Sequence, residues 1–288
     1  MNILPERFES LIEQGLGFVN DIEKQNNLRV VARTIATITW QQWQSSRPPE
    51  DNRPEHEWIV FINCMKIGES EGLSLSERRI AAAFSFLHDT FFIPRITETM
   101  IRNIENEIDQ SKTSRPDRAA ELQKQVTSLK AEKSEQRYLH MAGGAKNAAS
   151  ILSQLKHPDH SAELLLSGPE IDRCVYLIAR HDSWKLNEAY PLNSDRLAVV
   201  CFEADALWPL HPLGVLADLE RKDQNANIQD TTDPSEWQKQ IKENIKTLLE
   251  YRINWVNIEN ETFIDHESIF RTKEGHRLYR QWRTFWNC

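Results

Sequence analysis

Apolar residues recur along most of this chain at intervals of three and four positions, which is the spacing of amphipathic helices. In the first forty residues, the apolar positions with this spacing are Phe8, Leu11, Ile12, Leu16, Val30, Val31, Ile35 and Ile38. No convincing run of residues alternates between apolar and polar, as a half-buried strand does. The pattern therefore predicts an all-α protein.

Proline and polar residues mark where the predicted helices end. Residues 45–55, SSRPPEDNRPE, break the helical pattern and place His56 at the N-terminus of the next helix. Between residues 99 and 137, a narrow apolar stripe lies among charged residues and is divided by the turn SKTSRPD. This stretch predicts a helical-hairpin insert whose two solvated helices pack on each other. A lid over a site or a dimer contact is the less favoured interpretation.

The length and the helical pattern favour one domain over residues 1–288. We expect N-terminal helices over 1–45, a core over about 50–210 that contains the insert at about 99–137, and a C-terminal helical extension over about 233–288. In the extension, helices are predicted from about 234 to 253 and over the segment TKEGHRLYRQWRTFW. The second of these carries apolar residues on related faces, which are Leu278, Tyr279, Trp282 and Trp286.

The chain is acidic, with 35 Lys and Arg residues against 43 Asp and Glu residues and a net charge of -8. It has no overall basic field of the kind that attracts a nucleic-acid polymer. The segment MNILPERFESLIEQ lacks the basic and apolar regions of a signal peptide, and no window is apolar for long enough to cross a membrane. We expect a soluble cytoplasmic protein with no membrane partner. Cys64, Cys174 and Cys201 lie in apolar segments without CxxC spacing and are expected to be reduced core thiols.

Six histidine and aspartate residues lie inside or at the ends of apolar, helix-like segments. They occur in PEHEW, AAFSFLHDT, RYLHMAGGA, LIARHDSW and CFEADALW, and are His56, His88, Asp89, His140, His181 and Asp205. One His-Asp pair means little in a chain with nine histidines, but the order and the surroundings of this set carry weight. Imidazole and carboxylate groups suit Mn, Fe, Co, Ni and Zn, and one aspartate can place an oxygen on each of two ions. The set predicts a site for divalent metal ions.

The residues beside these histidines indicate a closely packed site. Gly143 and Gly144 follow His140 on the same helical face, where the absent side chains would let a neighbouring helix or a ligand approach. A run of alanines precedes His88, so the His-Asp pair is expected to end a rigid core helix. Asp205 lies between two alanines, where an unpaired carboxylate would be costly to bury and a metal would remove that cost.

In this order the six residues resemble the HD superfamily of metal-dependent phosphohydrolases, whose helical core supplies ligands in the order H, HD, H, H, D. The resemblance covers residues 56–208, about half of the chain. It implies that one metal is held by His56, His88, Asp89 and Asp205, and a second by His140, His181 and the bridging Asp89. It also implies hydrolysis of a small phosphorylated molecule, such as a nucleotide, by a metal-activated hydroxide, with Mn, Fe, Co, Ni or Mg as the ions.

A phosphorylated substrate would need cations or hydrogen-bond donors near the proposed ligands. The residues expected to bind it are Arg95, Arg137, Lys146, Lys185 and His211. Arg95 and Lys185, together with Asp89, are also expected to act in catalysis. In many HD proteins a lysine closely follows the His-Asp pair, whereas this chain reads HDTFFIPR and offers Arg95 as the nearby cation. For each of these cations, a solvated surface charge is the alternative interpretation.

Several residues near the proposed ligands have two interpretations. Asp182 either assists at the site or caps a helix. His157 and His160, in KHPDHS, fit a surface loop better than a metal site. Trp184 and Trp208 flank proposed ligands and either belong to the core or shape the pocket.

Two other functions stay open beside hydrolysis. The HD superfamily also contains oxygenases, in which a similar six-ligand site holds two irons that cleave a carbon–carbon or carbon–phosphorus bond. A regulatory protein with a structural metal is the third interpretation. Hydrolysis is favoured because it is the commoner activity of the fold, which is an argument by analogy. A homo-oligomer is also left open.

Overall fold

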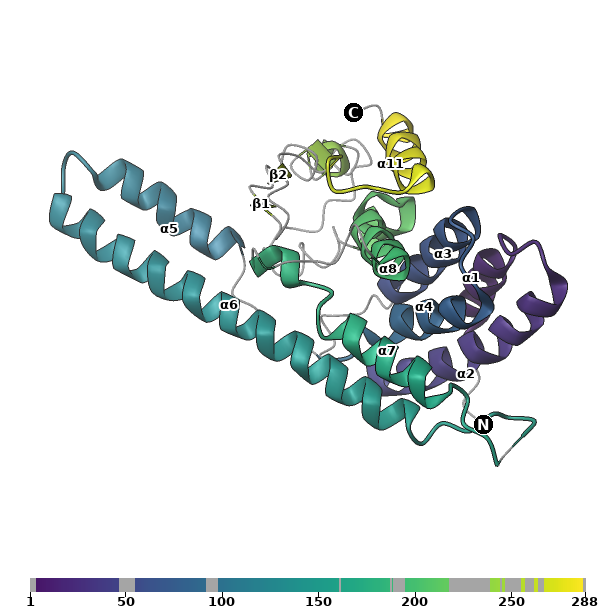
Figure 1. Cartoon of the computed structure of the whole chain (residues 1–288). Coiled ribbons are helices and arrows are strands. Elements are labelled where there is room, and N and C mark those ends of the chain that lie inside the picture. The colour runs from purple at the N-terminus through teal and green to yellow at the C-terminus, as the bar shows by residue number, and fades with distance from the viewer. Residues whose placement is uncertain are drawn as a thin grey trace.

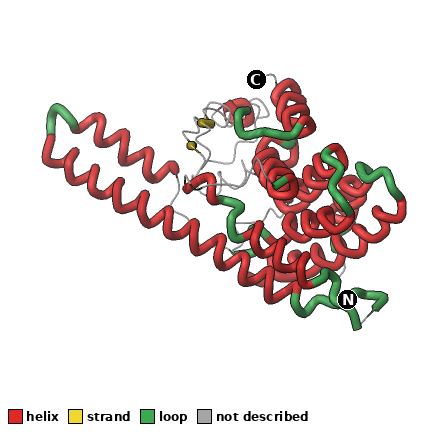
Figure 2. The backbone as a smooth tube through the Cα atoms, viewed as in Figure 1, coloured by secondary structure: helices red, strands yellow, loops and turns green. Residues whose placement is uncertain are grey.

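The computed structural model describes residues 4–46, 55–91, 98–160, 162–186, 188, 195–217, 239–243, 245–246, 255–256, 262–263 and 267–286. Over these residues the fold is all-α, as the sequence predicts (Figures 1 and 2). The α-helices are α1 (Glu6–Leu16), α2 (Ile22–Ser46), α3 (Glu55–Ser70), α4 (Leu75–Leu87), α5 (Glu98–Ser111), α6 (Pro116–Leu152), α7 (Gly168–Ile178), α8 (Arg196–Leu207) and α11 (Lys273–Phe285). Short 3-10 helices are η1 (Ser183–Leu186) and η2 (Trp208–Leu210), and the antiparallel strands β1 (Trp255–Val256) and β2 (Thr262–Phe263) have two residues each.

The centre of the core is α3, which packs against α1, α4, α8 and α11. Nearly every side chain of this helix from Trp58 to Cys64 is buried. A helix that is apolar around its whole circumference can only be stable inside a protein, which explains why four other helices surround it. Helix α3 begins at Glu55, so His56 lies in its first turn. This position agrees with the prediction from the proline-rich segment before the helix.

Local capping interactions fix where α4, α7 and α8 begin. Ser74 and Glu77 form a capping box at the start of α4, and Ser167 and Glu170 form another at the start of α7. The Asp195 carboxylate accepts a hydrogen bond from the Ala198 backbone at the start of α8. These caps satisfy backbone N–H groups and set the register of three helices that lead to the candidate site.

The predicted helical hairpin is present and extends away from the rest of the molecule (Figure 1). Helices α5 and α6 pack against each other through a separate apolar cluster that consists of Ile101, Ile108, Ala119, Leu122 and Val126. The hairpin has no boundary near residue 137, because α6 continues as one helix to Leu152. Its second half packs against α4 and α7, so one helix belongs to both the hairpin and the core.

The C-terminal helix α11 matches the predicted terminal helix and buries Leu278 and Tyr279 in the main core. Its start is held by Glu203 of α8, whose carboxylate accepts hydrogen bonds from the Thr272 backbone at 2.8 Å and from the Arg271 backbone. Most of the helix predicted from about 234 to 253 lies outside the described residues. Among the described helices, none is both long enough and apolar enough to cross a membrane.

Candidate metal centre

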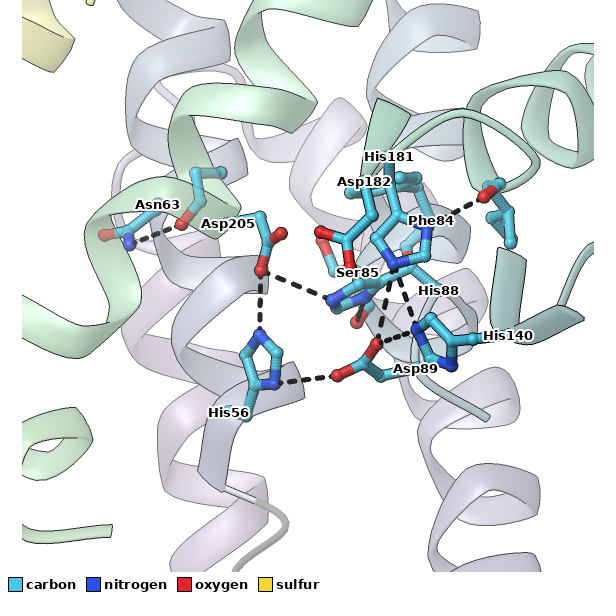
Figure 3. Close-up of polar contacts among 12 residues, drawn as sticks. His56, Asn63, Phe84, Ser85, His88, Asp89, His140, His181, Asp182 and Asp205 are labelled. Atoms are coloured by element: carbon cyan, nitrogen blue, oxygen red, sulfur yellow. Dashed lines mark hydrogen bonds and ion pairs between the residues drawn. The ribbon is translucent and has the colours of Figure 1, made fainter. Parts of the chain in front are cut away.

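Two groups of histidine and aspartate side chains lie next to each other at the ends of the core helices (Figure 3). The first group consists of His56, His88 and Asp205, and the second consists of Asp89, His140 and His181. In each group the donor atoms lie within 4.8 Å of one another. The fold therefore brings together all six residues that the sequence singled out, although His56 and Asp205 are 149 positions apart.

The first group is built on three core helices that pack against one another. His56 lies in the first turn of α3, His88 is the C-cap of α4, and Asp205 lies in the last turn of α8. His56 Nε2 is 2.9 Å from Asp205 Oδ1, and His88 Nε2 is 3.5 Å from the same oxygen. The Asp205 carboxylate therefore draws both rings toward one point.

The second group is built on less central segments. Asp89 follows the end of α4, His140 lies in α6, and His181 lies in the turn after α7. Asp89 Oδ1 is 2.9 Å from His140 Nε2 and 3.6 Å from His181 Nε2, and the two Nε2 atoms are 3.3 Å apart. Ligands that each lie about 2.1 Å from one ion at octahedral or tetrahedral angles are about 3.0–3.4 Å apart. The three separations therefore suit a single ion.

Asp89 connects the two groups. Its Oδ1 atom faces His140 and His181, and its Oδ2 atom lies 3.3 Å from His56 Nδ1 in the first group (Figure 3). A carboxylate can bind two ions at once only if its oxygens face two separate groups of ligands. Asp89 Oδ2 meets His56 at Nδ1, whereas Nε2 of the same ring faces Asp205, so Asp89 adjoins both groups.

Backbone carbonyls fix the orientation of three of the four histidine rings. His88 Nδ1 donates to Phe84 O at 3.2 Å and to Ser85 O at 3.1 Å. His140 Nδ1 donates to Phe91 O at 2.6 Å, and His181 Nδ1 donates to Ile178 O at 2.7 Å. A carbonyl oxygen only accepts, so each Nδ1 carries a proton and each Nε2 is left to face the centre. This is how histidine ligands of metals are usually held.

The Nε2 atoms of His140 and His181 give the strongest reason to expect a cation. With Nδ1 as the donor, a neutral ring turns its Nε2 lone pair inward, so two neutral rings would direct lone pairs at each other across 3.3 Å and at Asp89 Oδ1. Both rings are 2% exposed, and water cannot easily separate them. Two facing lone pairs repel unless a proton or a metal ion lies between them.

Close packing of α6 against α4 explains the two glycines near His140. A Cβ atom on Gly144 would lie 3.0 Å from the His88 carbonyl oxygen, and one on Gly143 would lie 2.2 Å from the Phe91 ring. Only glycine lets α6 approach the end of α4 this closely. The sequence-based prediction of a close approach at these positions is confirmed.

The pKa values of the first group reflect opposing effects of burial and charge. Burial alone would lower the pKa of His88, but the hydrogen bond to Asp205 and the charges of Asp89 and Asp205 outweigh it and raise the pKa to about 10. The pKa of His56 is also raised, because its hydrogen bonds to Asp205 and Asp89 outweigh its burial. Without a metal, protons on these two rings supply the positive charge that the carboxylates require.

The two carboxylates are correspondingly easy to ionise. Burial would raise the pKa of Asp89, but hydrogen bonds from His140, His181 and His56 outweigh it and hold the pKa well below its usual range. For Asp205, hydrogen bonds from His56 and His88 likewise outweigh burial and hold the pKa well below its usual range. Both groups are therefore anionic ligands at neutral pH.

Of the four cations expected to bind substrate, the structure describes the side chains of two. Arg95 lies outside the residues that the structure describes, and so does the side chain of Lys185. Lys146 is exposed and lies six residues after His140, which turns it by about 240° around α6. The Arg137 guanidinium donates to the Asp182 carboxylate, so its charge is already balanced inside the protein. This pairing ties Asp182 to helix α6.

His211 is placed beneath the C-terminal helix. It is 8% exposed, its ring packs edge to face on Trp282 at 5.0 Å, and its Nδ1 accepts a hydrogen bond from the Leu213 backbone at 3.3 Å. Burial and the charge of Lys66 lower the pKa of His211 to about 4, so the ring is neutral at pH 7. These contacts support a packing role and give no support for the expected contact with substrate.

Of the two tryptophans beside proposed ligands, Trp208 contacts the site. Its ring stacks on His56 with centroids 4.4 Å apart, whereas Trp184 packs edge to face on Phe202. His157 and His160 lie in the connection between α6 and α7, as the surface-loop interpretation expects. Three cysteines are buried and free, as predicted, and they are Cys64, Cys174 and Cys201.

Some residues that shape the site have no signal in the sequence. The carbonyls of Phe91 and Ile178 hold histidine rings through their backbone, which any residue type could do. The buried Glu203 anchors α11 to the helix that carries Asp205, although only its presence in an apolar segment distinguishes it. An acidic residue in such a segment is the one clue that could have been used.

Comparison with known proteins gives no further guidance, since no protein-family model, curated protein or solved structure matches this chain. The geometry alone indicates what the arrangement can do. Four imidazoles and two carboxylates form two adjacent donor groups that fit one divalent ion each, with Asp89 facing both.

Proposed function

We propose that this chain is a metal-dependent hydrolase that cleaves a phosphoester bond in a small molecule. The observation that carries the proposal is the pair of adjacent donor groups, with Asp89 in contact with His140 of its own group and with His56 of the other. The resemblance of the ordered residues to the HD superfamily supports the same conclusion. Two divalent ions held there would activate water as a nucleophile at neutral pH and neutralise charge on a phosphoryl group.

The residues of the chain contribute binding, orientation and charge. Asp89 and Asp205 are the two anionic ligands, and the backbone carbonyls keep three imidazole rings turned toward the centre. Two carboxylates balance only half of the charge of two divalent ions. The loaded site would keep a net positive charge, which attracts an anionic phosphate even though Arg137 is paired with Asp182.

The burial of the site favours a small substrate. The ligand side chains of His88, His140 and His181 are at most 2% exposed, whereas those of Asp205, His56 and Asp89 are 14%, 17% and 20% exposed. Such a site suits a phosphorylated small molecule such as a nucleotide better than a nucleic-acid polymer, which the net charge of -8 also disfavours. The expected cytoplasmic location and a homo-oligomer stay predictions.

The test is phosphate release from a panel of nucleotides and sugar phosphates by metal-stripped protein reloaded separately with Mn, Co, Ni, Mg or ferrous iron. We expect turnover with several redox-inert ions. Asp89→Ala should reduce that turnover by more than about 100-fold, because it removes a ligand from both groups. Asp109→Ala is the matched control, because Asp109 is an exposed aspartate of the hairpin that pairs with Lys112.

Three results would contradict the proposal. Turnover that survives Asp89→Ala would separate the activity from this site. No phosphate release from any substrate, combined with tight binding of iron and absorption that develops in air, would replace hydrolysis by the di-iron oxygenase interpretation. Metal binding with neither activity would favour the regulatory protein with a structural metal.

A further inference from the structure

Helix α6 and the turn after α7 meet at two adjacent positions. At the first, the Arg137 guanidinium donates a hydrogen bond to Asp182 Oδ2. At the second, His140 Nε2 lies 3.3 Å from His181 Nε2. Residues three apart on a helix share a face, and Asp182 directly follows His181, so the two contacts run side by side between the same two segments.

Both members of the charged pair are shielded from water. The Asp182 side chain is 3% exposed and that of Arg137 is 15% exposed. A buried carboxylate requires a charged or hydrogen-bonding partner, and the rigid, forked guanidinium fixes the direction from which that partner approaches. The pair therefore holds α6 at a defined distance and orientation from the turn that carries His181.

A second contact supports the same alignment nearer the surface. The Tyr138 hydroxyl donates to the Glu188 carboxylate, and the Ser183 hydroxyl donates to the same carboxylate at 3.2 Å. This region of α6 is thus tied to the chain just after His181 by two neighbouring side chains. The first donor group has a tie of its own, because the Asn63 amide of α3 donates to the Ala204 carbonyl of α8 at 3.1 Å beside Asp205.

We propose that Arg137 and Asp182 are positioning residues that set the spacing of His140 and His181 and thereby allow a second metal ion to bind. The inference rests on the proposed metal site. It adds that binding of the second ion, and not of the first, depends on this pair. It also gives Arg137 a role other than the substrate contact expected from the sequence.

The experiment counts the ions bound by the whole chain in equilibrium dialysis with Mn²⁺ and with Co²⁺. We expect two ions for the unaltered protein. Arg137→Ala should keep one ion at unchanged affinity and bind the second about 10- to 100-fold more weakly, which is the usual cost of removing a partner that orients a metal ligand. Arg137→Lys keeps the positive charge but not the forked guanidinium, and it should weaken binding of the second ion less than Arg137→Ala does.

A matched control and a second variant separate positioning from folding. Arg118→Ala removes another arginine of α6, one that is exposed and pairs with Glu107 of the hairpin, and it should still bind two ions. The double variant R137M/D182L removes both charges and leaves no buried charge without a partner, a replacement that proteins often tolerate. It should fold, as shown by its circular dichroism and melting temperature, and still bind the second ion weakly.

Three outcomes would overturn the inference. The first is two ions at unaltered affinity in folded Arg137→Ala or in the double variant. The second is an equal loss of both ions, because the pair would then support the whole site and not the second group. The third is an unaltered protein that binds no metal, which removes the proposed metal centre itself and is distinguished from the other two without any variant.

Discussion

The two donor groups contain the same residue types but are supported in different ways. His56, His88 and Asp205 lie on three helices whose mutual packing forms the main core. His140 and His181 lie on a helix that continues into the projecting hairpin and on a turn. The comparison indicates that the first group depends mainly on packing between helices, whereas the second also depends on contacts between α6 and the turn that carries His181.

His88 and His140 illustrate two ways in which a histidine ring is fixed. His88 Nδ1 donates to the carbonyls of Phe84 and Ser85 in its own helix, and the Phe84 ring stacks on the imidazole at 5.0 Å. His140 Nδ1 instead reaches Phe91 O, 49 positions away in the chain. The orientation of His88 follows from local helix geometry, but that of His140 exists only in the folded protein.

The largest effects are expected from removing one histidine of each group. His140→Ala should weaken binding of the second ion by more than about 100-fold and leave binding of the first ion unchanged. The reason is that α3, α4 and α8 keep their packing without the His140 side chain. His88→Ala should weaken the first ion at least as much and also weaken the second, since Asp89 adjoins it in the chain. Ion counts by equilibrium dialysis, with melting temperatures to verify folding, measure both effects.

The opposite pattern of ion binding would contradict the proposed difference between the two groups. If folded His140→Ala bound neither ion, the first group would not bind an ion independently of the second. His88→Gln is the second variant in case the cavity left by alanine prevents folding, because it keeps a polar side chain of similar length.

A smaller effect is expected from Gly144→Ala. The new Cβ would lie 3.0 Å from the His88 carbonyl oxygen and 3.4 Å from Ile178 Cγ2, so α6 or the end of α4 must shift by a few tenths of an ångström. Overpacking of this kind costs about 1–3 kcal/mol, and the better helix propensity of alanine offsets about 1 kcal/mol. We expect up to about 2 kcal/mol of destabilisation and up to about tenfold weaker binding of the second ion, measured by chemical unfolding and dialysis.

Gly168→Ala is the matched control for this substitution. Gly168 is the first residue of α7, and a Cβ there would meet no atom within 4 Å. It should change neither stability nor ion binding by a comparable amount. Equal effects of the two substitutions would mean that the close approach of α6 to α4 is unimportant for the second group.

The smallest effect on the metal groups is expected from His211, whose ring packs on Trp282 of α11. Its pKa of about 4 lies below the ordinary 6.5, so the unfolded chain binds the proton first as the pH falls. The folded protein should therefore lose about 2 kcal/mol of stability from this residue between pH 7 and pH 5, and His211→Gln should lack that loss. Unfolding in urea at both pH values measures the difference.

Ion binding at pH 7.5 should be the same in His211→Gln as in the unaltered protein. His160→Gln is the control for stability, because His160 is exposed. An unchanged pH dependence of stability in His211→Gln would show that the ring is not buried beside Trp282 as described.

Local spacing accounts for the parts of the fold that the sequence predicts. The periodic apolar residues of α1, α2 and α11 and the proline-rich break before α3 act over a few residues, so the helices and the position of His56 could be anticipated. The boundary of the hairpin could not be anticipated. No local signal ends α6 between the half that belongs to the hairpin and the half that packs on the core.

The sequence by itself determined the all-α class and the six histidine and aspartate residues whose order suggests a metal centre. Only the tertiary structure decided that Asp89 faces both groups, that Arg137 pairs with Asp182, and that His211 packs beneath α11. Helix formation depends on neighbours three and four positions away. The orientation of a ligand depends instead on contacts between residues as far apart as His56 and Asp205, which are set only when the helices pack together.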